Sequence, residues 1–184
     1  DHTEGDSAVS DSIAVAQTAN ERMADRVDDF TTLAQYGQTV DRLEAVALRA
    51  AAEDAWSKAE PGSTELQVDG GATINADPGR LRELLINAFV FAVQNGAETV
   101  TVEPHDSGFV ITGDGEPPGD AADYLAFGES VPDAESGMKL PSARAFARVH
   151  GWSASIDTDY QAGVRFVVSD VQVNAVDRSA QPSA

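Results

Sequence analysis

Residues 12–36 carry the first regular pattern of apolar positions, which alternate in steps of three and four from Ile13 to Ala34. This is the heptad spacing of a helix that packs against another helix. Asn20 occupies one seam position, where a polar residue lowers the stability of a helix pair but fixes its register. The pattern predicts a helix, ended by Gly37, that either forms the stalk of a homodimer or lies on its own domain.

A second helix is predicted over residues 41–59. Asp41 and Glu44 form a capping box, in which each side chain reaches an unpaired backbone N–H group. The expected buried stripe consists of Leu43, Val46, Ala47 and Ala50. Pro61-Gly62 ends this helical region.

The rest of the chain alternates between strand and helix patterns. Residues 65–69 and 72–76 alternate in polarity around Gly70-Gly71 and predict a β-hairpin. Asp77-Pro78 is typical of a helix start and Asn95-Gly96 of a helix end. The other predicted elements are strands at 99–103, 109–112, 153–157 and 164–169, a helix at 139–150, and a helical turn at 124–127 within a long loop at 113–137. This order predicts an α+β two-layer sandwich, in which helices cover one face of a mixed sheet.

Four regions follow from these patterns. They are a frayed or disordered lead at 1–11, a helical stalk at 12–60, the α+β domain at 61–170 and a disordered tail at 171–184. The tail is predicted to be disordered because it has few large apolar residues. Because the sequence begins at Asp1 rather than Met, we expect it to be a fragment of a longer protein.

The chain is strongly acidic, with 31 acidic and 12 basic residues and a formal net charge of −19. This charge is spread along the sequence, which argues against binding to a nucleic-acid backbone and favours a surface adapted to strong salt. There is no cysteine, so disulfides and thiolate metal sites are excluded. No apolar run approaches the ~18 residues of a membrane helix, and the acidic start does not resemble a signal peptide. We therefore expect a cytoplasmic protein.

Several short motifs occur in an order that resembles the catalytic domain of sensor histidine kinases. They are residues 77–87, the Gly113-Asp114-Gly115 turn after a strand, a glycine-led helix start, and His150-Gly151-Trp152. The resemblance covers most of the chain and is greatest for kinases of extreme halophiles. It implies a Bergerat-like ATPase fold behind a dimerisation helix, a homodimer through residues 12–36, a response-regulator-type partner, and ATP with Mg²⁺ as cofactors.

In this family the helix that begins at Pro78 carries two asparagines one turn apart, which face the triphosphate, and the second holds Mg²⁺. Asn87 stands at the first place, but Phe91 stands at the second. A phenyl ring offers no oxygen ligand, so the metal contact cannot be made as the family makes it. The alternative is that Asn87 is an exposed polar residue on a helix that otherwise packs.

The second motif of the family is Asp-x-Gly-x-Gly, whose carboxylate accepts the adenine amino group. If Gly113 and Gly115 are the two glycines, the adenine position falls on Ile111, which accepts no hydrogen bond. A shift of one or two residues brings in Gly113 or Asp114 instead, and Asp114 could then serve as the adenine contact at the expense of the glycine spacing. Gly-Asp-Gly is also a common turn sequence, so a plain loop remains an alternative.

The third motif, Gly-x-Gly-x-Gly before a helix, cradles phosphates in the family. Here one of the three glycines remains, Gly137, which follows Ser136, and Glu135 places a carboxylate where phosphate is expected. Lys139 is the candidate cation for the phosphates at this place. The alternative is that its side chain is simply exposed to solvent. The nucleotide-binding candidates are therefore Asn87, Gly113, Asp114, Gly115, Ser136, Gly137 and Lys139.

None of the three histidines has the sequence context of a phospho-acceptor or a metal ligand. His2 lacks the acidic residue and the proline that follow the acceptor histidine in the family, and it reads as an incidental terminal residue. His105 lies at the end of a predicted strand, and His150 lies at a helix end, where a positive charge suits the dipole. No catalytic residue is assigned.

Three functions fit these observations. The first is the ATP-binding, catalytic-type domain of a two-component sensor histidine kinase, a transferase that is impaired or a pseudokinase. The second is a non-catalytic dimerisation or partner-docking signalling module without ATP turnover. The third is an unrelated acidic α/β binding domain, in which the motifs are coincidental loops.

Overall fold

The computed structural model describes residues 40, 42–116 and 139–177. The predicted stalk helix at 12–36 and the predicted turn at 124–127 lie outside these residues. In chain order the elements are β1 (Glu44–Ala47), α2 (Leu48–Lys58), β2 (Glu65–Val68), β3 (Gly71–Ala76), α3 (Pro78–Gln94), β4 (Thr99–His105), β5 (Gly108–Gly113), α4 (Lys139–Val149), β6 (Ser153–Ile156), β7 (Val164–Ser169) and β8 (Val173–Asp177).

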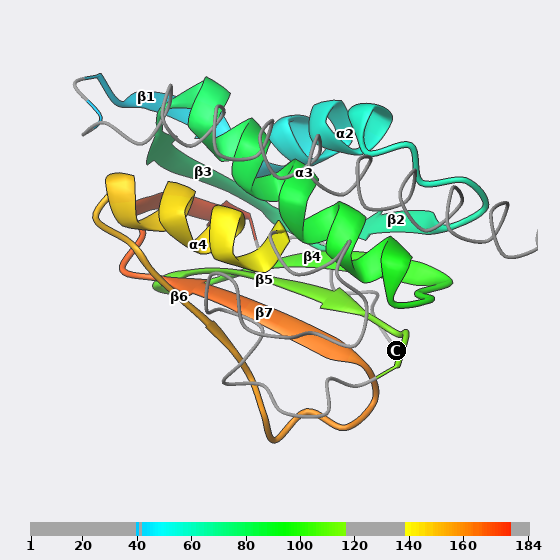
Figure 1. The fold of residues 1–184 in the computed structure, drawn as a ribbon. Coiled ribbons are helices and arrows are strands. Elements are labelled where there is room, and N and C mark those ends of the chain that lie inside the picture. Colours follow the sequence, from blue (N-terminus) through cyan, green and yellow to red (C-terminus); the bar gives the residue numbers. More distant parts are fainter. Residues whose placement is uncertain (1–39, 41, 117–138, 178–184) are drawn as a thin grey trace, which may run out of the picture.

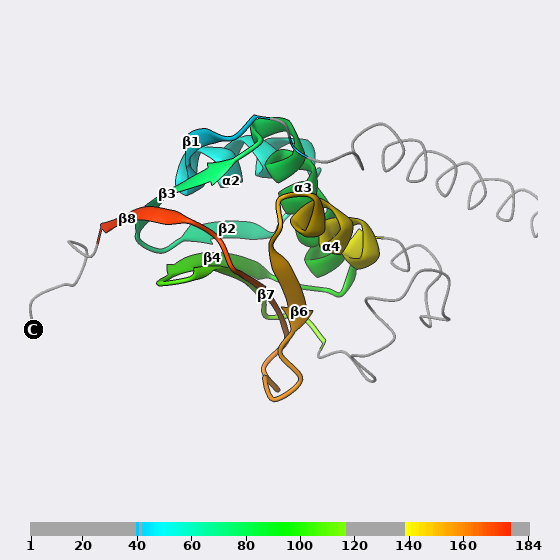
Figure 2. The same ribbon diagram turned by 90° about the vertical axis from the view of Figure 1, so that its left-hand side faces the viewer.

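The strands form two sheets. A five-stranded sheet has the order β2-β4-β5-β7-β6, in which β2 and β4 are parallel and the other pairs are antiparallel. A three-stranded antiparallel sheet has the order β1-β3-β8. Figures 1 and 2 show the helices together on one side of the five-stranded sheet, with β1 and β3 beside α2. The predicted α+β architecture, a mixed sheet with helices on one face, is confirmed.

The core lies between the helices and the inner face of the five-stranded sheet, and β3 of the other sheet also contributes to it. Along β5 and β7, buried residues such as Phe109 and Phe166 alternate with less buried neighbours, as the period of two in a half-buried strand requires. Helix α3 contributes buried residues along most of its length: Leu81, Leu84, Leu85, Asn87, Ala88, Phe89, Phe91 and Ala92. A helix this apolar fixes its position in the domain by packing rather than by intrinsic propensity.

Helix α3 begins as the sequence predicted. Asp77 is the N-cap, and its side chain accepts the backbone N–H of Arg80 at 2.9 Å. Pro78 follows in the first turn, and the helix ends at Asn95 before Gly96, which has a φ of +77°. The predicted strands at 99–103, 109–112, 153–157 and 164–169 and the helix at 139–150 are also confirmed, to within a few residues at their ends.

The predicted start of the second helix is wrong. Residues 44–47 form β1, which pairs with β3, and α2 begins only at Leu48. The buried stripe consists of Leu48, Ala52 and Ala55, while Leu43 is 49% exposed. Residues 44–47 pair their backbone with β3, and this tertiary interaction overrides a local capping signal.

The predicted hairpin is also wrong, although both of its strands exist. β2 pairs in parallel with β4, whereas β3 pairs with β1 and β8 in the other sheet. Arg49 holds the connection between them, because its guanidinium donates to the carbonyls of Val68 at 2.6 Å and Gly70 at 3.0 Å. Alternating polarity defines a strand but not its pairing partner.

The predicted disorder from residue 171 onward is wrong for β8, which pairs antiparallel with β3. Side-chain amides hold this strand: Asn75 donates to Gln172 at 3.2 Å, and Asn174 donates to Asn75 at 2.9 Å. The strand was missed because it is held by backbone and amide bonds rather than by large apolar residues. The boundaries of the four predicted regions remain predictions.

None of the described helices has the length and apolar character needed to span a membrane.

Candidate functional site

The described segments among those that resemble the nucleotide site meet beside α3. The end of α4 lies at the start of α3, where His150 contacts Asp77. α4 packs against α3 and is the shorter helix, so the start of α4 lies toward the middle of α3 (Figures 1 and 2). The end of β5 meets the other end of α3, because Gly113 lies against Ala92 and Ala97. The structure therefore brings Asn87, Phe91, Gly113 and Lys139 to the same region of the domain.

Asn87 is buried rather than exposed, with 7% of its surface accessible. Its side-chain nitrogen donates to the carbonyl of Glu83 at 2.8 Å, within the same helix. The alternative prediction, an exposed polar residue, is wrong. A buried asparagine that bonds its own helix backbone satisfies its donor locally, and this bond does not depend on a ligand.

Phe91 lies one turn after Asn87 and is 1% exposed within the hydrophobic core. Only carbon and hydrogen atoms are present in its side chain, so the position supplies no metal ligand. No group of three or more His, Cys, Asp or Glu side chains in the described part of the chain is arranged to hold a metal ion. Position 91 therefore does not fit the Mg²⁺ contact that the resemblance implies.

Gly113, the last residue of β5, and Gly115 each have a structural reason that involves no nucleotide. A Cβ added at Gly115 would lie 2.3 Å from the carbonyl oxygen of Asn95 and 2.8 Å from the nitrogen of Ala97. A Cβ at Gly113 would lie 3.0 Å from the Cβ of Ala92. Both glycines allow the chain after β5 to approach the C-terminal end of α3.

Asp114, between these glycines, joins the end of β5 to the start of β4. Its carboxylate oxygen Oδ1 accepts the backbone N–H groups of Glu98 and Thr99, each at 2.8 Å. The hydrogen bond from the Thr99 backbone is the main cause that lowers the pKa of Asp114 below 3.8, so this exposed carboxylate is ionised at neutral pH. One of its oxygens is thus already an acceptor for the protein backbone. Ile111, the alternative adenine position, is 2% exposed and belongs to the core.

The phosphate-binding candidates are only partly described. Ser136 and Gly137, together with Glu135, lie outside the described residues. Lys139 is the first residue of α4 and is half-buried. Pro141 and Ser142 are buried in the first turn of α4, where proline is favoured because it lacks an N–H group to satisfy.

The described histidines do not form a catalytic group with a nucleophile or metal. His105 Nδ1 contacts the backbone nitrogen of Ser107 at 3.3 Å and its hydroxyl at 3.2 Å. Burial lowers the pKa of the His150 ring below its ordinary value, which favours the neutral ring at this helix end. His2 lies outside the described residues.

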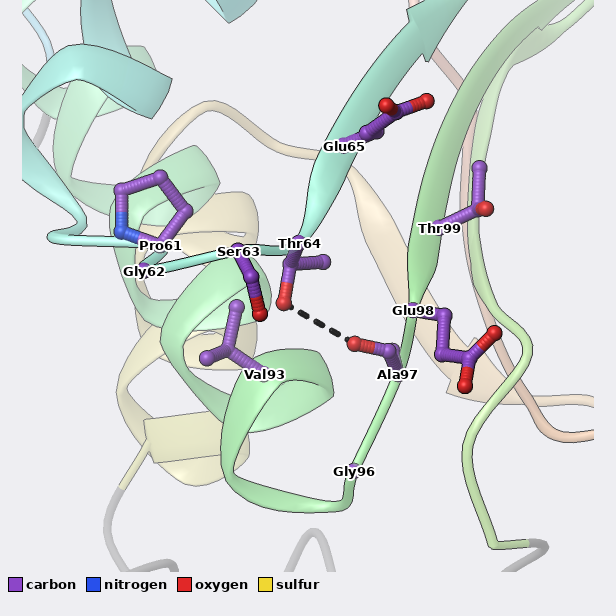
Figure 3. A pocket seen from close by; sticks show the side chains of 10 residues that line it. All are labelled: Pro61, Gly62, Ser63, Thr64, Glu65, Val93, Gly96, Ala97, Glu98 and Thr99. Atoms are coloured by element: carbon purple, nitrogen blue, oxygen red, sulfur yellow. Dashed lines mark hydrogen bonds between the residues drawn. The ribbon is translucent and has the colours of Figure 1, made fainter.

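Sequence reasoning missed a surface depression of about 690 Å³ between the α2–β2 connection and the end of α3. It is lined by Pro61, Gly62, Ser63, Thr64, Glu65, Val93, Gly96, Ala97, Glu98 and Thr99. In Figure 3 the Thr64 hydroxyl donates to the Ala97 carbonyl at 2.9 Å, and the side chains of Glu65 and Glu98 point away from α3. The turn signals Pro61-Gly62 and Asn95-Gly96 mark its two walls in the sequence, but no cluster of reactive groups faces into it.

Comparison with known proteins supports the fold. No protein-family model and no curated protein matches the chain. Among solved structures, the mycobacterial sensor histidine kinase MprB aligns with a TM-score of 0.56 at 20% identity over 68% of this chain and 95% of that one. The ATP-binding domain of PrrB from Mycobacterium tuberculosis aligns with a TM-score of 0.52 at 21% identity over 78% of this chain and 100% of that one.

Full-length ShkA in complex with AMPPNP aligns with a TM-score of 0.64 at 21% identity, over 86% of this chain and 38% of that one. Identities this low show the fold alone. The chain therefore has the α+β fold of the ATP-binding catalytic domains of sensor histidine kinases.

Proposed function

We propose that this chain is the ATP-binding, catalytic-type domain of a sensor histidine kinase in which the use of Mg·ATP is impaired. The fold and the order of the motifs support the first half of this proposal. In active phosphoryl-transfer enzymes, catalysis consists mainly of positioning and charge neutralisation by the metal. Loss of a metal ligand should therefore be severe for such a site.

The observation that carries the proposal is the burial of Phe91. The side chain at the expected metal position is 1% exposed, which makes it part of the packing that holds α3 in the domain. A ligand at this position requires another residue type and would cost part of the packing that Phe91 provides. We infer that Mg²⁺ is not held here and that phosphoryl transfer, if it occurs, is slow.

The contacts of the neighbouring candidates support the same conclusion. Asn87 bonds the Glu83 carbonyl, and Asp114 bonds the backbone at the start of β4. These side chains have structural partners in the protein. If ATP binds, Asn87, the Gly113–Gly115 turn and Lys139 are the described residues nearest to where the family holds it, and Ser136 and Gly137 complete that set.

The partners and the cellular setting follow from the family resemblance and the composition. We propose a homodimer through residues 12–36, a response-regulator-type partner and a cytoplasmic location. The net charge of −19 supports a halophilic setting, in which screening by salt limits repulsion among surface carboxylates.

The alternative is a non-catalytic dimerisation or partner-docking module that retains the kinase fold. It shares the same site but predicts no nucleotide binding with or without metal. A titration with ATP in the presence of EDTA separates the two proposals. An impaired kinase should bind ATP weakly, whereas a docking module should not bind it.

Substitution of Phe91 tests the proposal directly. The affinity for a fluorescent ATP analogue would be measured in molar KCl with Mg²⁺ or EDTA for the native chain, Phe91→Asn and Phe89→Asn. Phe89 is 0% exposed on the same helix, so its substitution is a control for the general loosening of α3. We expect Mg²⁺-dependent binding to be absent in the native chain, gained in Phe91→Asn and absent in Phe89→Asn. Mg²⁺-dependent binding by the native chain would overturn the proposal.

A further inference from the structure

The start of α3 and the end of α4 meet at the imidazole ring of His150. Its Nε2 accepts the backbone N–H of Asp77 at 3.0 Å, and its Nδ1 lies 2.7 Å from the carbonyl oxygen of Phe146. A carbonyl oxygen can only accept, so Nδ1 carries the proton and Nε2 carries the lone pair. These two contacts require the neutral ring in a single tautomer.

Helix α3 needs this contact because its own sequence leaves one backbone group at the N-cap without an acceptor. In a capping box, a Glu or Gln at the third helical position accepts the N–H of the N-cap residue. Here the N-cap is Asp77 and the third helical position is Arg80, whose guanidinium has no acceptor. His150 accepts this N–H from another helix and completes the cap.

The ring of His150 is held in place by aromatic packing. It stacks on Trp152, with ring centroids 4.1 Å apart and an angle of 14° between the planes. Trp152 is 6% exposed and meets Phe109 of β5 edge-on at 6.3 Å. Because the ring is fixed on this side, it cannot turn away from Asp77 without disturbing the packing above the sheet.

The electrostatic surroundings of the ring come from each element packed against it. Burial is the main cause that lowers the pKa of His150. From α3, Asp77 acts to raise this pKa and Arg80 acts to lower it, while α4 contributes the Phe146 carbonyl, which raises it. On the side of β6 the ring meets the uncharged Trp152. A protonated ring would turn an N–H at Nε2 toward the N–H of Asp77, and two donors cannot bond each other.

We propose that His150 is a pH-sensitive cap between helices, whose neutral ring holds the start of α3 against the end of α4 and whose protonation releases that contact. The contact joins the two helices that flank the candidate site, so pH acts on their relative position. This inference holds whether or not the domain binds ATP, because it concerns only the packing of α3 against α4.

The first test is an NMR titration of the native chain between pH 8 and pH 5 in molar KCl. The nitrogen shifts of the His150 ring should show the Nδ1–H tautomer at pH 8 and titrate with a midpoint below 6.5. The backbone amide of Asp77 should shift with the same midpoint. A ring that titrates without any response from the Asp77 amide would overturn the proposal.

The second test compares the pH dependence of denaturation midpoints. A histidine with a lowered pKa contributes its full stability above about 6.5, and this contribution is lost as the pH falls through the unfolded pKa toward the folded one. The denaturation midpoints of the native chain and of His105→Gln should therefore fall between pH 7.5 and pH 5.5. The midpoint of His150→Leu should not show this part of the decrease. Equal losses in the native chain and His150→Leu would contradict the proposal.

A rescue experiment separates capping from general packing. Arg80→Glu places a carboxylate at the third helical position, where it can accept the Asp77 N–H as a capping box does. We expect this change to raise the denaturation midpoint of His150→Leu relative to its effect in the native chain, where His150 already holds the N–H. An equal effect in both backgrounds would show that the two positions are uncoupled, and the proposal would fail.

Discussion

The helix side and the strand side of the candidate site differ in what their residues contact. On α3, Phe91 belongs to the hydrophobic core and Asn87 is buried with a bond to its own helix. After β5, Asp114 remains exposed and ionised, but its carboxylate bonds the backbone at the start of β4. The helix side therefore supplies packing, whereas the strand side carries a polar group that joins two strands.

This difference indicates which side a ligand could still use. Recovering a metal ligand on α3 requires a change in the core, because no oxygen is present at Phe91. On the strand side, the Asp114 carboxylate is already charged. A ligand there would have to compete with the backbone for one of its oxygens. The following substitutions test the comparison, from the largest expected effect to the smallest.

Phe91→Asn should destabilise the domain by about 3 kcal/mol or more, because it removes a buried ring and places an amide in an apolar site. Urea denaturation in molar KCl measures this cost. Phe89→Asn should cost a similar amount, since both rings are buried in the same helix. A loss below about 1 kcal/mol for Phe91→Asn would mean that the ring is not part of the core.

Gly115→Ala should destabilise the domain by about 2 kcal/mol, because its Cβ would lie 2.3 Å from the backbone oxygen of Asn95. The cost should be smaller for Gly113→Ala, whose nearest neighbour is the Ala92 methyl at 3.0 Å. Thermal denaturation of the two variants gives the order. If Gly115→Ala left the stability unchanged but reduced the ATP affinity, this glycine would be needed for nucleotide binding rather than for the contact with α3.

Asp114→Ala should destabilise the domain by about 1 kcal/mol, because two backbone N–H groups lose a charged acceptor. The loss stays this small because the carboxylate is exposed and water can partly replace it. The pKa of Asp114 is lowered in the fold, so its contribution is present above pH 3.8 and is lost as the pH falls through the folded pKa. Asp114→Asn, which keeps an acceptor, should retain part of the stability and remove this pH dependence. A pH profile unchanged in Asp114→Asn would contradict the assignment.

Asn87→Ala should change stability by less than about 1 kcal/mol, because the lost bond to Glu83 is offset by the better helix propensity of alanine. The binding of a response-regulator-type or other partner should be intact. Calorimetric titration of that partner into the native chain and the variant checks this. A large loss of partner affinity would place Asn87 in a binding surface rather than in the packing of α3.

The elements that were predicted correctly are those in which local signals agree. For α3, the Asp77 cap, Pro78 in the first turn, the apolar periodicity and the Asn95-Gly96 end all indicate one helix. For β1 and β8, the decisive interactions are pairings with β3, a strand distant in sequence from β8. Pairing partners are set by tertiary structure, which is why the hairpin and the tail were predicted wrongly.

The candidate site shows the same division. The residue type alone shows that position 91 offers no metal ligand. The burial of the Phe91 side chain could not be predicted from the sequence. The sequence also could not show that the space beside Gly115 is taken by the Asn95 carbonyl, or that Asp114 bonds Glu98 and Thr99. Each of these contacts joins segments that come together only in the folded domain.

The measurement that most directly tests the account is an NMR titration of the native chain with Mn²⁺ and ATP, because a bound paramagnetic ion broadens the signals of nearby amides. The account predicts no broadening centred on residues 87–91, since this part of α3 supplies packing and no metal ligand. Weak broadening confined to residues 113–115 would agree with a polar group that survives on the strand side only. Strong, ATP-dependent broadening centred on residues 87–91 would show that α3 still holds a metal–nucleotide complex and would contradict the account.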